Sequence, residues 1–324
     1  MRPVRRRGLL ALPAAAALPA ASGSAEAWPT GPIRLIAPFP PGGSVDTILR
    51  LLAPSLQAGL GVPVVVENRS GAAGALGTAA AARAAPDGQT WVLVFDSHAT
   101  INALNPQAGF DARRDFAPVM LVATAPMLLA TPVGRPWTRL AEVVAAARAR
   151  PNSLTYGTVG AGSLAHLTME VWQREAGLRL VHVPYRGGGP LAAAAAAGEV
   201  DLVIASRVGL GGQVGTRLRP LVQSGARRAA GLPDLPSFAE AGFPGVAAEA
   251  FWGMLGPAGV PAPILGRFHA ALAAALAEPG LRQRLEEGQG VDVVASTPAE
   301  FGAFLDRQIA LWGQVVRERG ITAD

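Results

Sequence analysis

Short apolar runs alternate with helical stretches along most of this chain, and this alternation limits the folds that it can adopt. Glycine, proline and asparagine bound the runs, and apolar residues at helical spacing follow most of them. The predicted strands are 33–37, 62–67, 91–95, 119–123, 127–131, 154–157, 178–183, 200–205 and 218–223. Strands that alternate with helices indicate βαβ units and mostly parallel sheets, so we predict an α/β fold.

Two segments are predicted to act as hinges between two lobes. Residues 130–134 leave the first block of strands, and residues 248–256 are predicted to be irregular chain that returns to it. We therefore predict a discontinuous domain 1 (28–130 plus 251–324) and a domain 2 (131–250). Two lobes joined by two crossings can close on a ligand.

The C-terminal part is predicted to be helical and to pack back on domain 1. Thr297-Pro-Ala-Glu300 is a capping box with proline at the first helical position. The helix that it begins is expected to end at Gly320.

The first 27 residues are typical of an export signal. Arg2, Arg5, Arg6 and Arg7 precede an apolar stretch at 9–21, and Ala25-Glu-Ala27 offers a cleavage site. The apolar stretch is too short for a membrane anchor. We predict a periplasmic protein that starts near Trp28, exported by the general secretory route or, from its paired arginines, the twin-arginine route.

Composition excludes several classes of function. After residue 27 the chain has 24 basic and 22 acidic residues, a formal charge of +2, and every basic residue is arginine. Without a basic stripe interleaved with aromatic residues, nucleic acid is not a predicted partner. The absence of lysine excludes a phosphate-binding P-loop, and the absence of cysteine excludes disulfides and thiol chemistry.

The segment Ile33–Asp46 combines a strand, a glycine turn and a helix start. The apolar run ends at Pro38, Gly42-Gly43 makes the turn, and Ser44 is a predicted helix N-cap. Such a start aims free backbone N–H groups and a positive dipole end at one point, as in an anion site. An ordinary strand-to-helix connection has the same pattern, so both interpretations stay open.

A second segment, Tyr156–His166, repeats this arrangement in the other lobe. It carries Gly160 and Gly162, then Ser163 as a predicted N-cap, and His166 in the first helical turn. Two such starts facing across a cleft would hold the two ends of a dianion. His166 either contacts that ligand or is a partly buried histidine bonded by a neighbouring loop.

Two further loops follow strands at the edge where open α/β sheets bind ligands. They are Asp96–Thr100 and Val183–Gly189, the second of which contains Tyr185 and Arg186. Arg186 could contact a carboxylate or be a solvated surface residue.

Catalytic patterns are weak, and the chain is not predicted to be an enzyme. Gly160–Ala165 fits a dinucleotide fingerprint, but the next strand ends without an acidic residue for a ribose. No G-x-S-x-G elbow and no metal-binding histidine pattern are present. The alternative is an exported hydrolase or isomerase with Asp46 and His166 as its acid/base pair. No metal and no cofactor are predicted.

Several motifs in order resemble the tripartite tricarboxylate transporter substrate-binding proteins, also called the Bug family. The motifs are Trp28-Pro29, Ala37–Gly43, Val65–Arg69 with Gly71 and Gly74, Ala85–Gly88, Tyr156–Gly162 with His166, His182–Tyr185, Gly198–Asp201, Leu232–Pro236 and Glu240–Gly242. The resemblance implies a two-lobed type 2 periplasmic binding fold and a monomer that captures small organic carboxylates. It also implies permease subunits of that transporter as partners, or, alternatively, an orphan receptor or sensor with the same pocket.

The resemblance also implies that loops 38–44 and 158–163 bind ligand carboxylates. Relatives commonly have Asp-Asn where this chain has Ala205-Ser206, which removes a partner for an ammonium group, so we predict a plain carboxylate ligand and not an amino acid. The candidate ligand-binding residues are Phe39, Pro40, Gly42, Gly43, Ser44, Asp46, Ser97, His98, Thr158, Gly160, Gly162, Ser163, His166, Tyr185, Ala205 and Ser206.

Overall fold

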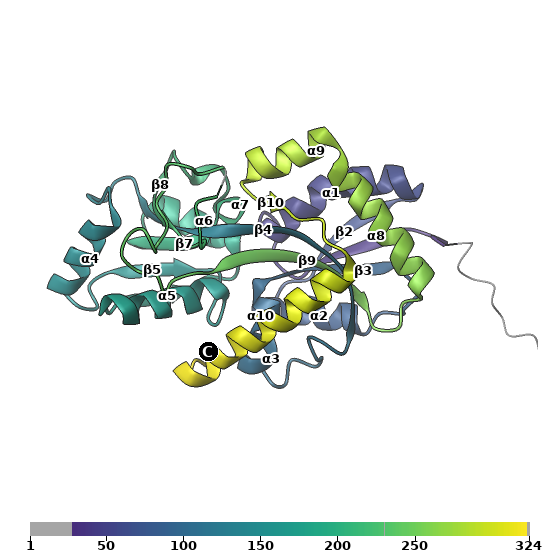
Figure 1. Cartoon of the computed structure of the whole chain (residues 1–324), viewed down its shortest axis with the longest axis horizontal. Coiled ribbons are helices and arrows are strands. Elements are labelled where there is room, and N and C mark those ends of the chain that lie inside the picture. Colours follow the sequence, from purple (N-terminus) through teal and green to yellow (C-terminus); the bar gives the residue numbers. More distant parts are fainter. Residues whose placement is uncertain (1–27, 230, 323–324) are drawn as a thin grey trace, which may run out of the picture.

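The fold is two α/β lobes that share one continuous sheet, seen in a computed structural model that describes residues 28–229 and 231–322 (Figure 1). The predicted signal segment, 1–27, lies outside the described residues. The strands are β1 (Ile33–Ala37), β2 (Val64–Asn68), β3 (Thr90–Phe95), β4 (Phe116–Pro132), β5 (Thr155–Thr158), β6 (Val181–Pro184), β7 (Leu202–Ser206), β8 (Leu218–Gln223), β9 (Glu249–Pro257) and β10 (Asp292–Val293).

Helices cover the sheet in both lobes. The α-helices are α1 (Ser44–Leu60), α2 (Ala75–Ala82), α3 (Ile101–Leu104), α4 (Leu140–Ala149), α5 (Leu164–Ala176), α6 (Gly188–Ala197), α7 (Arg207–Leu210), α8 (Ala262–Ala277), α9 (Pro279–Gln283) and α10 (Pro298–Arg319). Short 3₁₀ turns are η1 (Ala72–Gly74), η2 (Asp96–Ala99) and η3 (Gly211–Gln213), and η4 (Arg284–Gln289) is a π-helical turn. None of the helices in the described ranges is both long and apolar enough to cross a membrane.

The predicted α/β fold with two lobes is confirmed, and its sheet is mixed. β1 pairs in parallel with β2 and β3 in one lobe, and β5 pairs in parallel with β6 and β7 in the other. β4 pairs antiparallel with β7, β8, β9 and β10. The β4–β9 pair is antiparallel because the chain crosses between the lobes twice, in opposite directions.

The crossings are two long strands, which corrects two sequence predictions. Runs 119–123 and 127–131 belong to the single strand β4, and the predicted irregular segment 248–256 is largely β9. Pro126 lies between the two runs, and a proline cannot donate to a ladder. It stands opposite Glu249 at the end of β9, and from Met127 onward β4 pairs with β7 instead. We propose that this change of partner is the hinge, close to the predicted domain boundary at 130.

The C-terminal helices pack on the first lobe, as predicted. α8 lies against α1, and α10 packs on β4 (Figure 1). Thr297 caps α10 through the predicted capping box with Glu300, and the helix ends at the left-handed Gly320. Phe301 of α10 sits over Gly253 of β9, where a side chain would collide with its ring.

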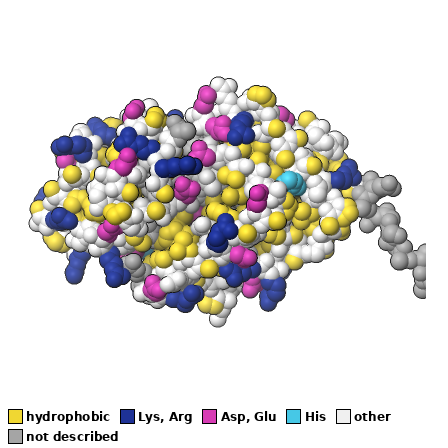
Figure 2. Space-filling model, in the orientation of Figure 1, with side chains coloured by type: hydrophobic (Ala, Val, Ile, Leu, Met, Phe, Trp, Pro, Cys, Tyr) yellow, Lys and Arg dark blue, Asp and Glu magenta, His cyan; other side chains and the backbone are white. Residues whose placement is uncertain are grey.

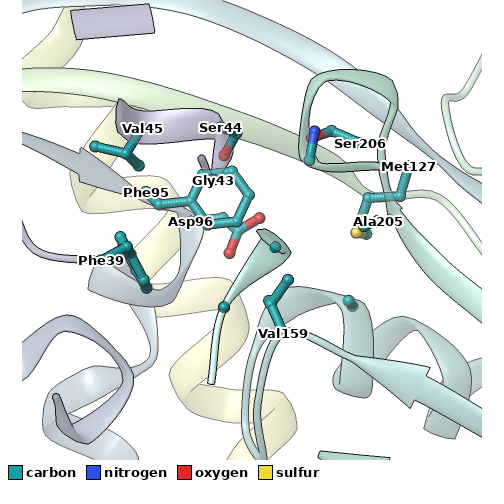
Figure 3. Close-up of a pocket in the computed structure, with 14 residues that line it drawn as sticks. Phe39, Gly43, Ser44, Val45, Phe95, Asp96, Met127, Val159, Ala205 and Ser206 are labelled. Carbon is teal, nitrogen blue, oxygen red and sulfur yellow. The ribbon is translucent and has the colours of Figure 1, made fainter. Parts of the chain in front are cut away.

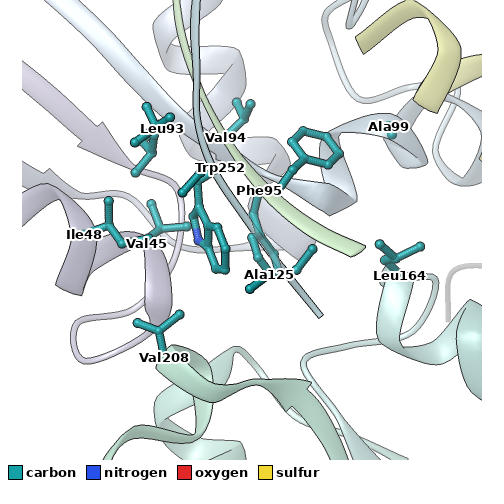
Figure 4. Close-up of a cluster of buried hydrophobic side chains, with 14 of the residues drawn as sticks. Val45, Ile48, Leu93, Val94, Phe95, Ala99, Ala125, Leu164, Val208 and Trp252 are labelled. Atoms are coloured by element: carbon teal, nitrogen blue, oxygen red, sulfur yellow. The ribbon is translucent and has the colours of Figure 1, made fainter. Parts of the chain in front are cut away.

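The largest hydrophobic cluster continues from one lobe into the other. Val45 and Ile48 of α1 lie in it with Trp252 of β9, and Leu164 and Val208 reach it from the second lobe (Figure 4). The two lobes are therefore packed against each other in this structure. On the face shown in Figure 2, basic and acidic side chains are interspersed.

Candidate functional site

A small pocket lies between the lobes, where helix starts from both converge (Figure 3). Its cavity is about 20 Å³, which is room for about one water molecule. The lining residues are Phe39, Gly43, Ser44, Val45, Phe95, Asp96, Met127, Val159, Ala165, Gly187, Gly188, Ala205, Ser206 and Gly209. In this set Asp96 alone has an ionisable side chain, so a bound anion would depend on backbone N–H groups and hydroxyls.

The loop before α1 is held in place by Asp46. Its carboxylate accepts hydrogen bonds from the backbone N–H of Gly42 (3.0 Å) and the amide of Asn68 (2.9 Å), and it pairs with Arg50 (2.9 Å). Asn68 also donates to the carbonyl of Phe39 (3.1 Å). Burial raises the pKa of Asp46, but these hydrogen bonds outweigh it and lower the pKa overall. Asp46 therefore supports the loop from behind the pocket wall.

Ser44 does not cap its helix, which corrects the sequence prediction. Helix α1 begins at Ser44 itself, and Gly43 occupies the N-cap position without a side-chain hydrogen bond. The Ser44 hydroxyl accepts a hydrogen bond from the indole N–H of Trp252 (3.2 Å). Trp252 thus fixes the hydroxyl at the wall of the pocket, and the free N–H groups of the first turn of α1 start beside it.

In the second lobe, Ser163 is the N-cap of α5, as predicted. Its hydroxyl accepts from the backbone N–H of His166 (3.3 Å) and donates to the carbonyl of Gly160 (2.7 Å). The Nδ1 atom of His166 accepts from the backbone N–H of Gly162 (3.0 Å). The second interpretation of His166, a histidine bonded by a neighbouring loop, therefore describes its place in this structure.

His166 also belongs to a row of stacked rings behind this loop. It stacks on His182 at 4.1 Å between ring centroids, and His182 stacks on Tyr156 at 5.0 Å. Burial, with a contribution from His166, lowers the pKa of His182 to about 4. A neutral His182 hydrogen-bonds the hydroxyl of Thr158 (2.7 Å), so the row supports the loop at the end of β5.

Two more helix starts of the second lobe reach the pocket. Helix α6 begins at Gly188, with Gly187 at a positive φ of 108° before it. Ser206 caps the short α7 by accepting from the backbone N–H of Gly209 (3.2 Å). The starts of α1, α5 and α6 therefore face one space, and their dipoles together favour a negative charge there.

The pocket includes five of the predicted ligand-binding residues, namely Phe39, Gly43, Ser44, Ala205 and Ser206. The others do not line it in this structure; they are Pro40, Gly42, Asp46, Ser97, His98, Thr158, Gly160, Gly162, Ser163, His166 and Tyr185. Most of them belong to the loops that shape the pocket, and a direct role for them in ligand contact stays a prediction.

His98 and Ser97 do not line the pocket, and ligand contact by them stays a prediction. His98 hydrogen-bonds the carbonyl of Ala112 (3.0 Å) and packs against Phe110 and Phe116. Burial lowers its pKa to about 4, so it is a neutral core residue. The Ser97 hydroxyl donates to the carbonyl of Ala73 (3.2 Å). The short turn η2 after β3 brings Asp96, one residue earlier, to the cavity instead.

Sequence reasoning missed nine lining residues: Val45, Phe95, Asp96, Met127, Val159, Ala165, Gly187, Gly188 and Gly209. Some of these lie in segments that the sequence did single out, since Asp96 begins Asp96–Thr100 and the glycine pair lies within Val183–Gly189. Met127 carried no signal, because a methionine inside an apolar strand is typical of a core. Within the described ranges, no cluster of three His, Cys, Asp or Glu could hold a metal ion.

Asp96 is the unusual group of the pocket, and its protonation can be tested through stability. Burial raises its pKa well above the usual range. As pH rises, the carboxyl group loses its proton at a lower pH in the unfolded chain than in the folded protein. The free energy of unfolding therefore falls between about pH 4 and the pKa of Asp96 in the folded protein. We expect Asp96→Asn to raise the melting temperature by about 2–4 °C at pH 8 for each ~1 kcal/mol of this cost, and by less at pH 4. Calorimetric scans at both pH values measure this, and an equal gain at both would contradict a neutral Asp96.

Comparisons with known proteins agree on one family. The pattern of the tripartite tricarboxylate transporter family receptors matches residues 48–321. Protein BugT of Bordetella pertussis is 34% identical over 304 residues, which cover 93% of this chain and 93% of that protein.

Solved structures of similar proteins share the fold over about nine-tenths of this chain. The periplasmic binding protein BugD superimposes with a TM-score of 0.86 at 28% identity, covering 92% of this chain and 100% of that one. R. palustris Rpa4515 with adipate superimposes with a TM-score of 0.87 at 31% identity, covering 91% of this chain and 99% of that one. MatC from Rhodopseudomonas palustris with bound malate has a TM-score of 0.83 at 29% identity, covering 89% of this chain and 100% of that one. With its two lobes and its pocket at the convergence of helix starts, this chain belongs to the tripartite tricarboxylate transporter receptor family of periplasmic solute-binding proteins.

Proposed function

We propose that this protein captures a small organic carboxylate between its lobes and delivers it to the membrane permease of a tripartite tricarboxylate transporter. The observation that carries the proposal is the convergence of the starts of α1, α5 and α6 on one pocket without a basic side chain. Backbone N–H groups at helix starts suit a carboxylate that must be bound and then released. The similar structures with adipate and malate support the same ligand class.

Capture would require the lobes to open and close. A cavity of about 20 Å³ is far smaller than a dicarboxylate, so a ligand enters only when the lobes separate. Opening would separate the apolar contacts between the lobes and polar ones such as the hydrogen bond from the hydroxyl of Thr100 to the carbonyl of Gly162 (3.1 Å). Rotation about β4 and β9, where β4 changes partners, would open the pocket.

The proposal includes export and a monomer. Residues 1–27 would direct the chain to the periplasm, where the folded protein would begin near Trp28. A two-lobed monomer has its complete ligand site within one chain, since both walls of the pocket come from the described residues.

A thermal-shift screen tests the proposal on the purified protein. Malate, adipate, citrate, succinate and aspartate would be compared with uncharged glycerol and with inorganic phosphate. A carboxylate present at 1,000 times its Kd stabilises by about 4 kcal/mol, which corresponds to a rise of about 8–16 °C. The bound acid would then be recovered and analysed by NMR. A screen without any carboxylate shift, or an acid recovered chemically changed, would contradict solute capture.

A further inference from the structure

Asp96 is a buried carboxyl at the centre of the pocket. It follows the last residue of β3 and begins η2, and its residue is only 2% exposed. Its carboxylate points into the space between Phe39, Ser44 and Val159 (Figure 3). Among the described residues neither oxygen has a hydrogen-bond partner. A buried carboxyl that is left unsatisfied is costly, which indicates a role that only a ligand completes.

Among the described residues, no cationic side chain contributes to the pKa of Asp96. On its own segment, His98 is neutral and hydrogen-bonds a backbone carbonyl on the other side. From α1, Asp46 is paired with an arginine of its own helix, and from α5, His166 stacks on a second histidine. The aliphatic part of Arg207 of α7 lies against Gly290, the residue after η4.

The other elements around Asp96 bring apolar groups. β3 and β9 contribute Phe95 and Trp252, whose rings are 5.3 Å apart. On α10, which packs on η2, Asp306 is an exposed residue paired with Arg113. Burial accordingly dominates the pKa of Asp96 and raises it. Only the backbone N–H groups of Ser97 and of Leu164, at the start of α5, oppose this rise, and neither makes a hydrogen bond of full geometry with the carboxyl group.

A carboxyl in such a place keeps its proton and becomes a hydrogen-bond donor. Two carboxylates that share a site cannot both be ionised, so a ligand carboxylate beside Asp96 would be bound through one shared proton. The helix starts would supply donors to the other oxygens of the ligand. A ligand ammonium group would instead need the ionised form of Asp96, which this apolar wall disfavours.

We propose that Asp96 binds the ligand as a neutral carboxylic acid that donates a hydrogen bond to a ligand carboxylate oxygen, so that the pocket selects dicarboxylates without an ammonium group. The inference rests on the proposed function and adds the residue that sets the ligand class. The absence of Asp-Asn at Ala205-Ser206 also predicts a ligand without an ammonium group, and that argument rests on a different observation.

Calorimetric titration of two variants separates a neutral donor from an ionised partner. Asparagine keeps a donor in the place of the acid proton, whereas alanine removes it. With malate and adipate as probes at pH 7, Asp96→Asn should bind at least tenfold more tightly than Asp96→Ala. If Asp96→Asn binds malate and adipate no more tightly than Asp96→Ala does, the inference is overturned.

The same titrations are run with aspartate and glutamate, and from pH 6 to 8.5 with the dicarboxylates. The wild type should bind succinate and malate more tightly than aspartate, and its affinity for the dicarboxylates should stay level or fall as pH rises. Two results would show that Asp96 is ionised and would overturn the inference. The first is a wild type that binds aspartate more tightly than succinate and malate, with that binding lost in Asp96→Asn. The second is a wild-type affinity for dicarboxylates that rises with pH. If no carboxylate binds the wild type at all, the proposed function itself fails, and the two failures are thereby distinguished.

Discussion

Replacement of Gly189 by tryptophan is expected to hold the two lobes apart and to weaken ligand binding about a hundredfold. Gly189 lies in the first turn of α6, and a Cβ atom there would be 3.4 Å from the carbonyl oxygen of Pro41 and 3.9 Å from the carbonyl carbon of Gly42, in the loop of the other lobe. A tryptophan side chain at this position would collide with the backbone of the Pro41–Gly42 loop, and backbone atoms cannot rotate away as a side chain can. If the closed state falls to about 1% of molecules, the apparent Kd rises about 100-fold.

Gly189→Ala is the matched control for Gly189→Trp. An alanine Cβ fits at ordinary contact distance. Both substitutions place a Cβ before Pro190, so the cost of a side chain before proline is common to the two variants. Gly189→Ala should therefore bind malate or adipate within a few-fold of the wild type. Small-angle scattering should show a larger radius of gyration for Gly189→Trp than for Gly189→Ala, with no loss of melting temperature. If Gly189→Trp stays as compact as Gly189→Ala and binds malate or adipate as tightly, the lobes do not close at the contact between Gly189 and the Pro41–Gly42 loop.

Local patterns in the sequence were enough for the elements whose ends are set by nearby residues. Helix α5 begins where predicted because Ser163 caps it, and Gly177 ends it in a left-handed conformation. Helix α10 follows from Thr297 and Gly320 in the same way. Strand β8 also has its predicted bounds. These signals work because a cap or a positive φ depends on one or two side chains.

The sequence did not predict features that depend on the whole fold. Pro126 reads as a strand end, yet β4 runs through it because its partner changes there from β9 to β7. Ser44 reads as a cap, yet its hydroxyl is taken by Trp252, more than two hundred residues away. Whether a side chain lies in a pocket or a core, as with Asp96 and His98, depends on which elements fold over it.

Trp252→Ala is expected to lower the free energy of unfolding by about 3–5 kcal/mol, the range for a large aromatic side chain removed from a core. Trp252 is fully buried in β9, opposite Phe95 of β3 in the sheet, and its ring packs on Phe95 (Figure 4). It also holds Ser44 at the pocket wall through its indole N–H. Its loss would leave a cavity where the first strands, the start of α1 and the crossing strand meet.

The phenylalanine variant separates the ring from the hydrogen bond. Trp252→Phe keeps an aromatic ring on Phe95 and loses only the N–H that donates to Ser44, so its cost should be about 1 kcal/mol plus a small packing loss. Urea unfolding followed by far-ultraviolet circular dichroism measures both variants without relying on tryptophan fluorescence. Equal midpoints for the two variants would mean that the hydrogen bond, and not the packing, carries the contribution of Trp252. A weaker affinity of Trp252→Phe for malate, at nearly unchanged stability, would place the Ser44 hydroxyl among the groups that hold the ligand.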